Sequence, residues 1–161
     1  MNFKEGSPQA SAVTMTQLVL PSHTNNLDTV FGGTIMSWVD IAAAISAGRH
    51  CKKTVVTASI DALHFLAPVY KGWVVEIKAR VNYVSSKSLE VGVEVDGFEP
   101  KTNKKHHTAS ALLTFVALDD NKKPSSVPPL LVETEEDKKL FEAAKKRRAY
   151  RLEQRNSLLK S

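Results

Sequence analysis

The sequence predicts an α+β fold in which a long central helix is wrapped by a curved antiparallel sheet, with a basic helix at the C-terminal end. Residues 34–48 are apolar almost all round, which is typical of a buried helix. One strand-like segment precedes this run, and four follow it through short polar linkers, which favours antiparallel neighbours. Because such a helix needs a partner surface on every side, a second copy of the chain is expected against the side that the sheet leaves open.

The expected elements follow from periodicity and from residues that end them. In the segment that begins at Trp73, apolar and charged residues alternate with period two, as in a strand with one buried face. Gly48 is placed to end the long helix. Thr134 and Asp137 form a plausible capping box for a last helix. The predicted strands cover about 13–20, 54–66, 73–83, 89–98 and 106–118, and the last helix covers about 135–156.

Composition bounds the class of protein. The chain has 161 residues, of which 42% are hydrophobic and 24% charged, as in one soluble globular domain. It has no apolar run long enough to span a bilayer and no apolar core of the signal-peptide kind near Met1, so we expect a cytoplasmic protein. We divide it into a flexible N-terminal end (1–11), a folded domain (12–120), a polar, proline-rich linker (121–133) and the basic C-terminal helix (134–161).

The positive charge is concentrated in the last segment. Residues 138–161 hold nine Lys or Arg and two Glu, a net charge of +7, which leaves the rest of the chain at −2. Such a segment can meet phosphate on nucleic acid, on an anionic membrane or on coenzyme A. This segment lacks interleaved aromatic residues other than Tyr150, and the rest of the chain is mildly acidic, so we expect no nucleic acid as a partner. We expect no membrane partner either. The short apolar patch of this helix predicts that it is loosely attached, or held by another subunit or a ligand.

The cysteine and the histidines predict neither a nucleophile nor a metal site. Cys51 is interpreted as a surface thiol at a helix end. The spacing of His23, His64, His106 and His107 matches no zinc site, and surface positions are expected for them. We therefore expect no metal and no cofactor.

The stretch from Thr24 to Asp40 combines a turn, two glycines and a helix start. The first amides of a helix lack acceptors and attract negative charge, and Gly32 and Gly33 let a ligand approach them, which describes an oxyanion hole. Asp40 sits in an otherwise apolar helix, so its carboxylate needs a partner or lines a cavity. It lies about 10 Å beyond Gly33 along the helix axis, so one carbonyl carbon cannot contact both within one chain.

Four stretches of the sequence carry a resemblance to a known family. They are TNNLDTVFGGTIMSWVD, TASIDALHFLAPVYKGWVVEI, YVSSKSLEVGVEV and the basic tail FEAAKKRRAYRLEQR. The chain resembles the hotdog-fold acyl-CoA thioesterases over about residues 13–118. The resemblance implies a single hotdog domain over 12–120 that hydrolyses acyl-CoA thioesters to a free acid and coenzyme A, the latter entering only as part of the substrate and product. It also implies a homodimer, and a hexamer built as a trimer of dimers.

The resemblance also implies roles for particular residues. Asn25 and Asp40 fall on the family's catalytic pair, contributed by opposite subunits. Asp40 would activate water or attack the thioester directly, Asn25 would orient the water or the carbonyl, and the amides of Gly32 and Gly33 would hold the oxyanion. Asp28 stands where the family usually has glycine. Aspartate tolerates a positive φ, but a carboxylate pointing into the site would repel an oxyanion.

Coenzyme A contacts are expected at two places. The resemblance assigns Ser86, Lys87 and Ser88, before the predicted strand 89–98, to the phosphates, although an ordinary hairpin turn is the other interpretation. Arg147 and Arg148, with Arg151, are candidates for a nucleotide phosphate of a neighbouring subunit, or else form a solvated face.

Three alternatives stay open at this point. A hotdog acyl-CoA dehydratase would use a histidine, for which only His23 is near the motif. A non-catalytic acyl-CoA sensor would not need Asp40. A nucleic-acid-binding module would rely on the basic tail.

Overall fold

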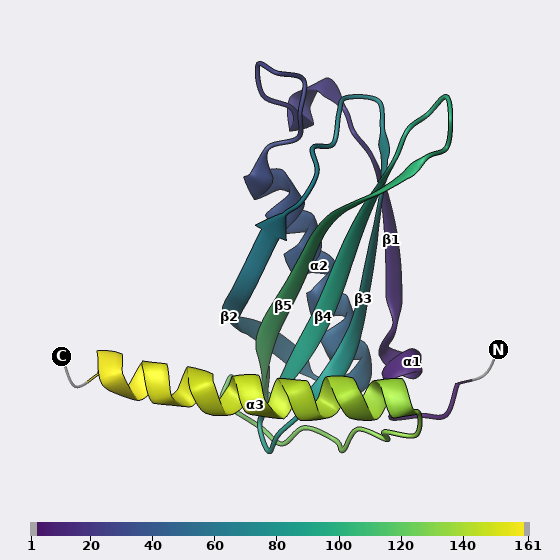
Figure 1. Ribbon diagram of the computed structural model, residues 1–161. Coiled ribbons are helices and arrows are strands. Elements are labelled where there is room, and N and C mark those ends of the chain that lie inside the picture. Colours follow the sequence, from purple (N-terminus) through teal and green to yellow (C-terminus); the bar gives the residue numbers. More distant parts are fainter. Residues whose placement is uncertain (1–2, 160–161) are drawn as a thin grey trace.

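A computed structural model describes residues 3–159 as a five-stranded antiparallel sheet that wraps one long helix (Figure 1). The strand order is β1-β3-β4-β5-β2. Helix α2 lies against one face of the sheet, and α3 crosses the opposite face near one end of the strands. The predicted α+β architecture is confirmed. The elements are α1 (Pro8–Ser11), β1 (Val13–Leu18), a 3-10 turn (Pro21–His23), α2 (Gly32–Cys51), β2 (Thr54–Phe65), β3 (Val74–Val84), β4 (Ser88–Phe98), β5 (Lys105–Leu118) and α3 (Glu135–Leu158).

The core lies between α2 and the inner face of the sheet. Val39, Ala42 and Ala43 of α2 are fully buried, and their small side chains allow the helix to approach the sheet closely. The opposite side of the same helix is not covered: Met36 and Ile41 remain 39% and 47% exposed. The prediction that one chain cannot bury the whole helix is therefore confirmed.

The end of α2 differs from the prediction. The helix runs past Gly48 to Cys51, because Lys52 takes the left-handed conformation (φ 51°) and donates its N–H to the carbonyl of Gly48 at 2.8 Å. The prediction of a surface thiol is also wrong. Cys51 is 2% exposed, and burial raises the pKa of its thiol to about 11, so it is a poor nucleophile.

The N-terminal end is more ordered than expected. Within the described part of residues 1–11, Ser7 caps the short helix α1 by accepting the N–H of Ala10 at 3.2 Å. Ser11 is buried and accepts the N–H of Val81 at 2.9 Å. Strand β1 pairs with β3 only as far as Ala79, so Ser11 satisfies the next free amide of that strand. The expected flexible end is wrong for residues 7–11, and residues 1 and 2 lie outside the described chain.

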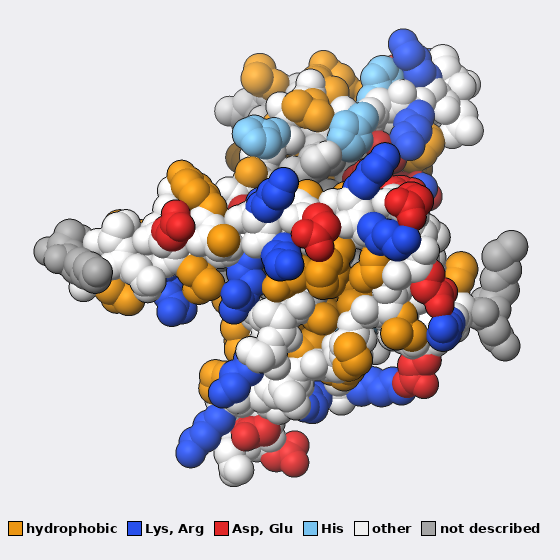
Figure 2. Space-filling view, turned by 60° about the horizontal axis from the view of Figure 1, so that its bottom comes forward, with side chains coloured by type: hydrophobic (Ala, Val, Ile, Leu, Met, Phe, Trp, Pro, Cys, Tyr) orange, Lys and Arg blue, Asp and Glu red, His pale blue; other side chains and the backbone are white. Residues whose placement is uncertain are grey.

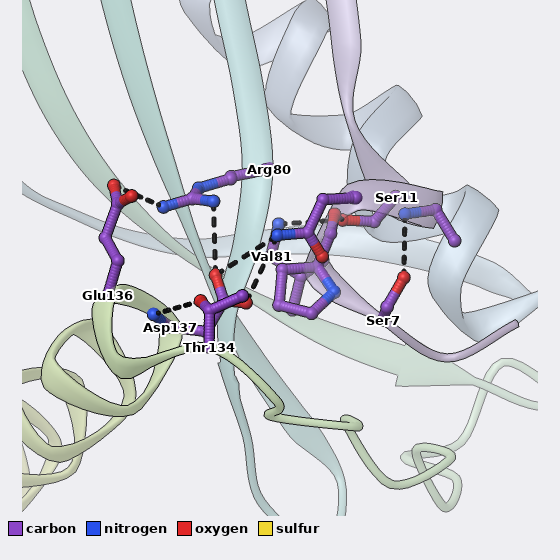
Figure 3. A network of polar contacts seen from close by, with 10 residues as sticks. Ser7, Ser11, Arg80, Val81, Thr134, Glu136 and Asp137 are labelled. Carbon is purple, nitrogen blue, oxygen red and sulfur yellow. Dashed lines mark hydrogen bonds and ion pairs between the residues drawn. The ribbon is translucent and has the colours of Figure 1, made fainter. Parts of the chain in front are cut away.

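Helix α3 begins with the predicted cap and is tied to the sheet at its first turn (Figure 3). The hydroxyl of Thr134 accepts the N–H of Asp137 at 3.0 Å. The buried carboxylate of Asp137 accepts hydrogen bonds from Arg80 of β3 at 3.2 Å and from Gln9 at 3.1 Å. Burial acts to raise the pKa of Asp137, but the hydrogen bonds with Thr134 and Gln9 and the charge of Arg80 outweigh it and hold the pKa below its ordinary value.

A second attachment lies further along α3. Arg147 donates to both carboxylate oxygens of Glu90 on β4, at 2.6 and 3.1 Å, and Arg151 donates to the same carboxylate at 3.2 Å and also pairs with Asp61 of β2. The side chain of Glu90 is fully buried, so it needs these cations. The prediction of loose attachment is wrong, because acidic residues of its own sheet hold the helix.

Candidate active site

Gly32 and Gly33, the residues predicted to form the oxyanion hole, are the first two residues of α2. The carbonyl of Phe31 accepts the N–H groups of Thr34 and Ile35, at 3.0 and 3.2 Å. The N–H groups of Gly32 and Gly33 have no acceptor within residues 3–159. A Cβ at Gly33 would meet nothing within 4 Å, so space is open beside this amide. The helix start can therefore donate to an anionic oxygen.

An apolar cavity of about 350 Å³ adjoins this helix start. Phe65 and Leu66 from the end of β2 line it together with Gly32. A Cβ at Gly32 would come within 3.2 Å of the Phe65 ring and would push the ring back by a few tenths of an ångström, so glycine lets the ring pack close to the helix. The cavity places apolar walls beside the unpaired amides.

Asn25 is held in the loop before α2 by its own side chain. Its Oδ1 accepts the N–H of Leu27 at 2.9 Å, the N–H of Thr29 at 3.3 Å and the Thr29 hydroxyl at 3.1 Å. These three contacts occupy the oxygen and leave the amide NH₂ group for other partners. Asn25 can therefore act as a hydrogen-bond donor.

Asp28 stands in the loop before α2 with a positive φ. Its φ is 58°, in the left-handed region that aspartate tolerates. Its carboxylate accepts a hydrogen bond from Lys71 at 2.9 Å. The negative charge is therefore paired with a cation of the β2–β3 loop.

Asp40 has a partner that the sequence did not reveal. The hydroxyl of Thr57 on β2 donates to Oδ1 of Asp40 at 2.7 Å. Asp40 is half-buried and lies on the same uninterrupted helix as Gly33, two turns further on. No spacing in the sequence points to Thr57, because its contact depends on how β2 returns alongside α2.

The proposed coenzyme A residues lie at the other end of the sheet. Ser88 pairs with Val116, whereas Phe65, which contacts the start of α2, pairs with Ala109. The carbonyls of Ser86 and Lys87 accept backbone N–H groups from the linker and from β5, at 3.0 and 3.1 Å. One chain therefore keeps residues 86–88 and the glycine amides apart, at opposite ends of a 20-residue helix about 30 Å long.

The three arginines proposed for phosphate differ in their surroundings, and Arg151 is bound to Glu90 and Asp61. Arg147 donates two hydrogen bonds to the carboxylate of Glu90. Arg148, its neighbour, has no ion-pair or hydrogen-bond partner within residues 3–159. Of the three candidates, Arg148 is the one whose guanidinium is free for a ligand within the described residues.

Other chemistries find little support among the described residues. His23 accepts the N–H of Leu20 through Nδ1 at 3.1 Å, and its ring meets Trp38 edge-on at 5.1 Å. Across residues 3–159 there is no cluster of three side chains suited to hold a metal ion. In the same range no helix combines the length and the hydropathy needed to cross a bilayer.

Comparison with known proteins identifies the family. Residues 27–102 match the sequence model of the Thioesterase superfamily. An acyl-CoA hydrolase from Bacillus cereus has the same fold, with a TM-score of 0.90 and 35% identity over 98% of this chain and 96% of that one. The chain belongs to the thioesterase superfamily.

Further members of the thioesterase superfamily are similar to this chain in sequence and in structure. The acyl-CoA hydrolase of Staphylococcus aureus, solved with butyryl coenzyme A and coenzyme A, matches with a TM-score of 0.84 and 36% identity over 94% of this chain and 95% of that one. An uncharacterized acyl-CoA thioester hydrolase of Bacillus subtilis is 43% identical over 109 residues, which are 68% of this chain. The chain spans 63% of the length of that relative and 32% of the human cytosolic acyl coenzyme A thioester hydrolase.

Proposed function

We propose that this chain is an acyl-CoA thioesterase whose active sites are each built from two subunits. The observation that carries the proposal is the unpaired amides of Gly32 and Gly33 at the start of the helix that also carries Asp40. Relatives described as acyl-CoA thioester hydrolases support the substrate class. Coenzyme A takes part only as the leaving group, and no cofactor is proposed.

The glycine amides would stabilise the transition state. When a nucleophile adds to a thioester carbonyl, the carbonyl oxygen becomes negatively charged. Donors already aimed at that position stabilise it without reorganising, and one such donor typically lowers the barrier by about 3 kcal/mol. The free NH₂ group of Asn25 at the same end of the helix can donate to the same carbonyl or to the attacking water.

Asp40 would supply the nucleophile. It either takes a proton from water as the water attacks, or attacks directly to give an anhydride that water then opens. In both routes the carbon–sulfur bond breaks and coenzyme A leaves as the thiolate. The Thr57 hydroxyl holds one carboxylate oxygen, which leaves the other oxygen for the reaction.

A dimer would bring the two halves together. The apolar side chains left exposed on α2 continue onto β2, which is an edge strand of 12 residues. An exposed edge with apolar residues beside it is a surface for pairing with another chain. A second copy placed there would cover this face and set Asp40 of one subunit near the glycines of the other. The exposed residues are Met36, Ile41, Ile45, Val56 and Ile60.

Solved relatives support the same residues and assembly. Structures of the Staphylococcus aureus enzyme include alanine variants of an Asn, an Asp and a Thr, spaced along that chain as Asn25, Asp40 and Thr57 are along this one. Two neighbours are described as hexameric, which supports a trimer of dimers. Ser86, Lys87 and Ser88, with Arg148, are proposed to contact the coenzyme A phosphates from a neighbouring subunit. A cytoplasmic location is proposed by analogy with the cytosolic relatives.

The proposal is tested by release of free thiol from acyl-CoAs ranging from acetyl to palmitoyl. The wild-type protein should release thiol, and Asp40→Ala should lower kcat by at least about a hundredfold while acyl-CoA still binds. Binding without turnover by the wild-type protein would indicate a sensor. Hydration of a 2-enoyl-CoA without thiol release would indicate a dehydratase.

The two-subunit site has a sharper test. Asn25→Ala and Asp40→Ala should each be inactive as pure proteins, but a mixed dimer would contain one site with both residues intact. Random mixing makes half of the dimers mixed, so co-expression should restore about a quarter of the wild-type activity. If both residues acted within one chain, every site in the mixture would lack one of them and no activity would return.

A further inference from the structure

Three polar side chains form a hydrogen-bonded chain on the outer face of the sheet, away from the proposed thioesterase site. Nδ1 of His107 lies 3.0 Å from Oδ1 of Asp96, and Nε2 of the same ring lies 2.8 Å from Oγ of Ser110. This is the order of contacts found among an orienting carboxylate, a general base and a nucleophile in serine hydrolases.

The charge state of Asp96 fits this arrangement. Its side chain is 3% exposed and also pairs with Lys105 at 2.8 Å. Burial acts to raise the pKa of Asp96, but the hydrogen bonds from Lys105 and His107 outweigh it and hold the pKa below its ordinary value. An ionised carboxylate keeps the imidazole proton on Nδ1, so Nε2 is free to accept the Ser110 hydroxyl proton.

An irregularity in the sheet makes the contact possible. In a regular strand, residues three apart point to opposite faces, so His107 and Ser110 would not meet. The pairing of β4 with β5 shifts at this point: Val95 pairs with Ala109, whereas Asp96 pairs with His107. The extra residue, Thr108, turns His107 to the same face as Ser110.

Ser110 opens into a large cavity. Its side chain is exposed and lines a cavity of about 620 Å³ between the outer face of the sheet and α3. Ala62, Leu112 and Leu140 supply apolar walls. Figure 2 shows this side of the molecule, with Lys and Arg side chains along α3 and histidine side chains exposed on the sheet beyond it. His107 and Asp96 are not among the residues that line the cavity.

The neighbours of Ser110 in the sheet limit the substrate class. His64 on β2 and Glu94 on β4 are its paired residues on either side, and both line the cavity. His64 can donate a hydrogen bond to a carbonyl oxygen. The lining also holds Lys78, Arg80 and Arg147, but each of these cations is paired with a carboxylate. Glu94 places a negative charge beside the serine, which disfavours anionic acyl donors such as acyl-CoA and favours uncharged esters.

We propose that Ser110 is a nucleophile activated by His107 and Asp96, and that it accepts acyl groups from small uncharged carboxylic esters in this cavity. Ser110 Oγ bonds to the ester carbonyl carbon while its proton passes to Nε2 of His107. The ester carbon–oxygen bond then breaks, and the alcohol leaves with that proton. Water activated by the same nitrogen hydrolyses the acyl-serine and restores the hydroxyl.

The test is covalent labelling with a fluorophosphonate, followed by intact-mass measurement and peptide mapping. The wild-type protein should gain one label per chain at Ser110, and Ser110→Ala should gain none. His107→Gln, which keeps a polar side chain for folding, should slow labelling at least about a hundredfold. His106→Ala, one residue away and bound to Glu99 instead, is the matched control and should label as the wild type does.

The same samples separate this site from the thioesterase site. Asp40→Ala should lose thiol release from acyl-CoA and keep the Ser110 label, and it should keep hydrolysis of p-nitrophenyl acetate. Absence of label at Ser110 in the wild-type protein, or equal labelling of His107→Gln, would overturn the proposal and leave Asp96, His107 and Ser110 as structural contacts.

Discussion

The hydroxyl of Thr57 donates a 2.7 Å hydrogen bond to Oδ1 of Asp40 and so joins strand β2 to helix α2 across 17 positions of the sequence. A hydrogen bond to a carboxylate is short and directional, so it fixes the rotamer of Asp40 before any substrate arrives. The proposed nucleophile or base is thus held by a residue outside its own helix.

Thr57→Ala should therefore lower kcat about tenfold, equivalent to about 1.4 kcal/mol, with little change in KM. Thr57→Ser keeps the hydroxyl and should retain most of the activity. Steady-state thiol release measures kcat and KM of both variants. Thr16→Ala, which changes an exposed threonine of β1, is the control. A rise in KM at constant kcat would show that Thr57 contacts substrate rather than positioning Asp40.

Asp28 should be replaceable by glycine but not by alanine. Its φ of 58° costs an ordinary L residue about 1–2 kcal/mol, whereas glycine adopts it freely. We expect Asp28→Ala to be less stable than Asp28→Gly by about 1 kcal/mol in urea unfolding. Asp28→Asn loses the charge paired with Lys71 but keeps the tolerance for this φ, so it should stay close to the wild type.

Arg147 and Arg148 should differ in what they stabilise. Arg147→Met leaves the buried Glu90 carboxylate with Arg151 alone, so the free energy of unfolding should fall by about 2 kcal/mol. Arg148→Met should change stability little. Thermal unfolding measures the difference, and limited proteolysis in the linker 121–133 reports release of α3. Equal stability of the two variants would mean that the Glu90 contact does not hold the helix.

The attachment of α3 should weaken in acid. Because the folded pKa of Asp137 is depressed, its stabilisation is present above the unfolded value of about 3.9 and is lost as pH falls through the folded pKa. The gap in unfolding free energy between the wild type and Asp137→Asn should be widest above about pH 5 and narrow below about pH 4. Glu136→Gln, which removes an exposed carboxylate on the same turn, is the matched control.

Cys51 should be unreactive in the folded protein. Burial raises its pKa to about 11, so the thiolate is scarce at pH 8 and reagents cannot reach it. A disulfide reagent should modify it at least about a hundredfold faster after unfolding in guanidinium chloride. Rapid modification in native buffer would contradict the burial. The same result keeps the thiol-release assay free of a protein background.

Local sequence patterns were enough to predict the helices and strands and their order along the chain. Period-two alternation predicted the segment from Trp73 as a strand with one buried face, and β3 buries alternate residues along most of its length. The apolar run before Gly48 predicted a buried helix. Its end was mispredicted because Lys52, rather than a glycine, takes the left-handed cap. Element ends depend on one residue's φ, which side-chain pattern alone does not determine.

Contacts between distant segments could not be predicted. Ser11 meets Val81 and Arg147 meets Glu90 across 70 and 57 positions, and nothing local marks either pair. For this reason the order of residues 7–11 and the firm attachment of α3 were both missed. The roles assigned to Asn25 and Asp40 stay predictions, since each depends on a neighbouring subunit.

The sequence by itself determined which groups are available: two glycines at a helix start, an aspartate in an apolar helix and a left-handed position that aspartate tolerates. These follow from residue type and helix geometry within a few turns. Only the tertiary structure decided which partners those groups have. Thr57 reaches Asp40 because β2 packs beside α2, and Lys71 reaches Asp28 because the β2–β3 loop folds over that turn. Side-chain hydrogen bonds act over about 3 Å, so they form only after the chain has brought distant residues together.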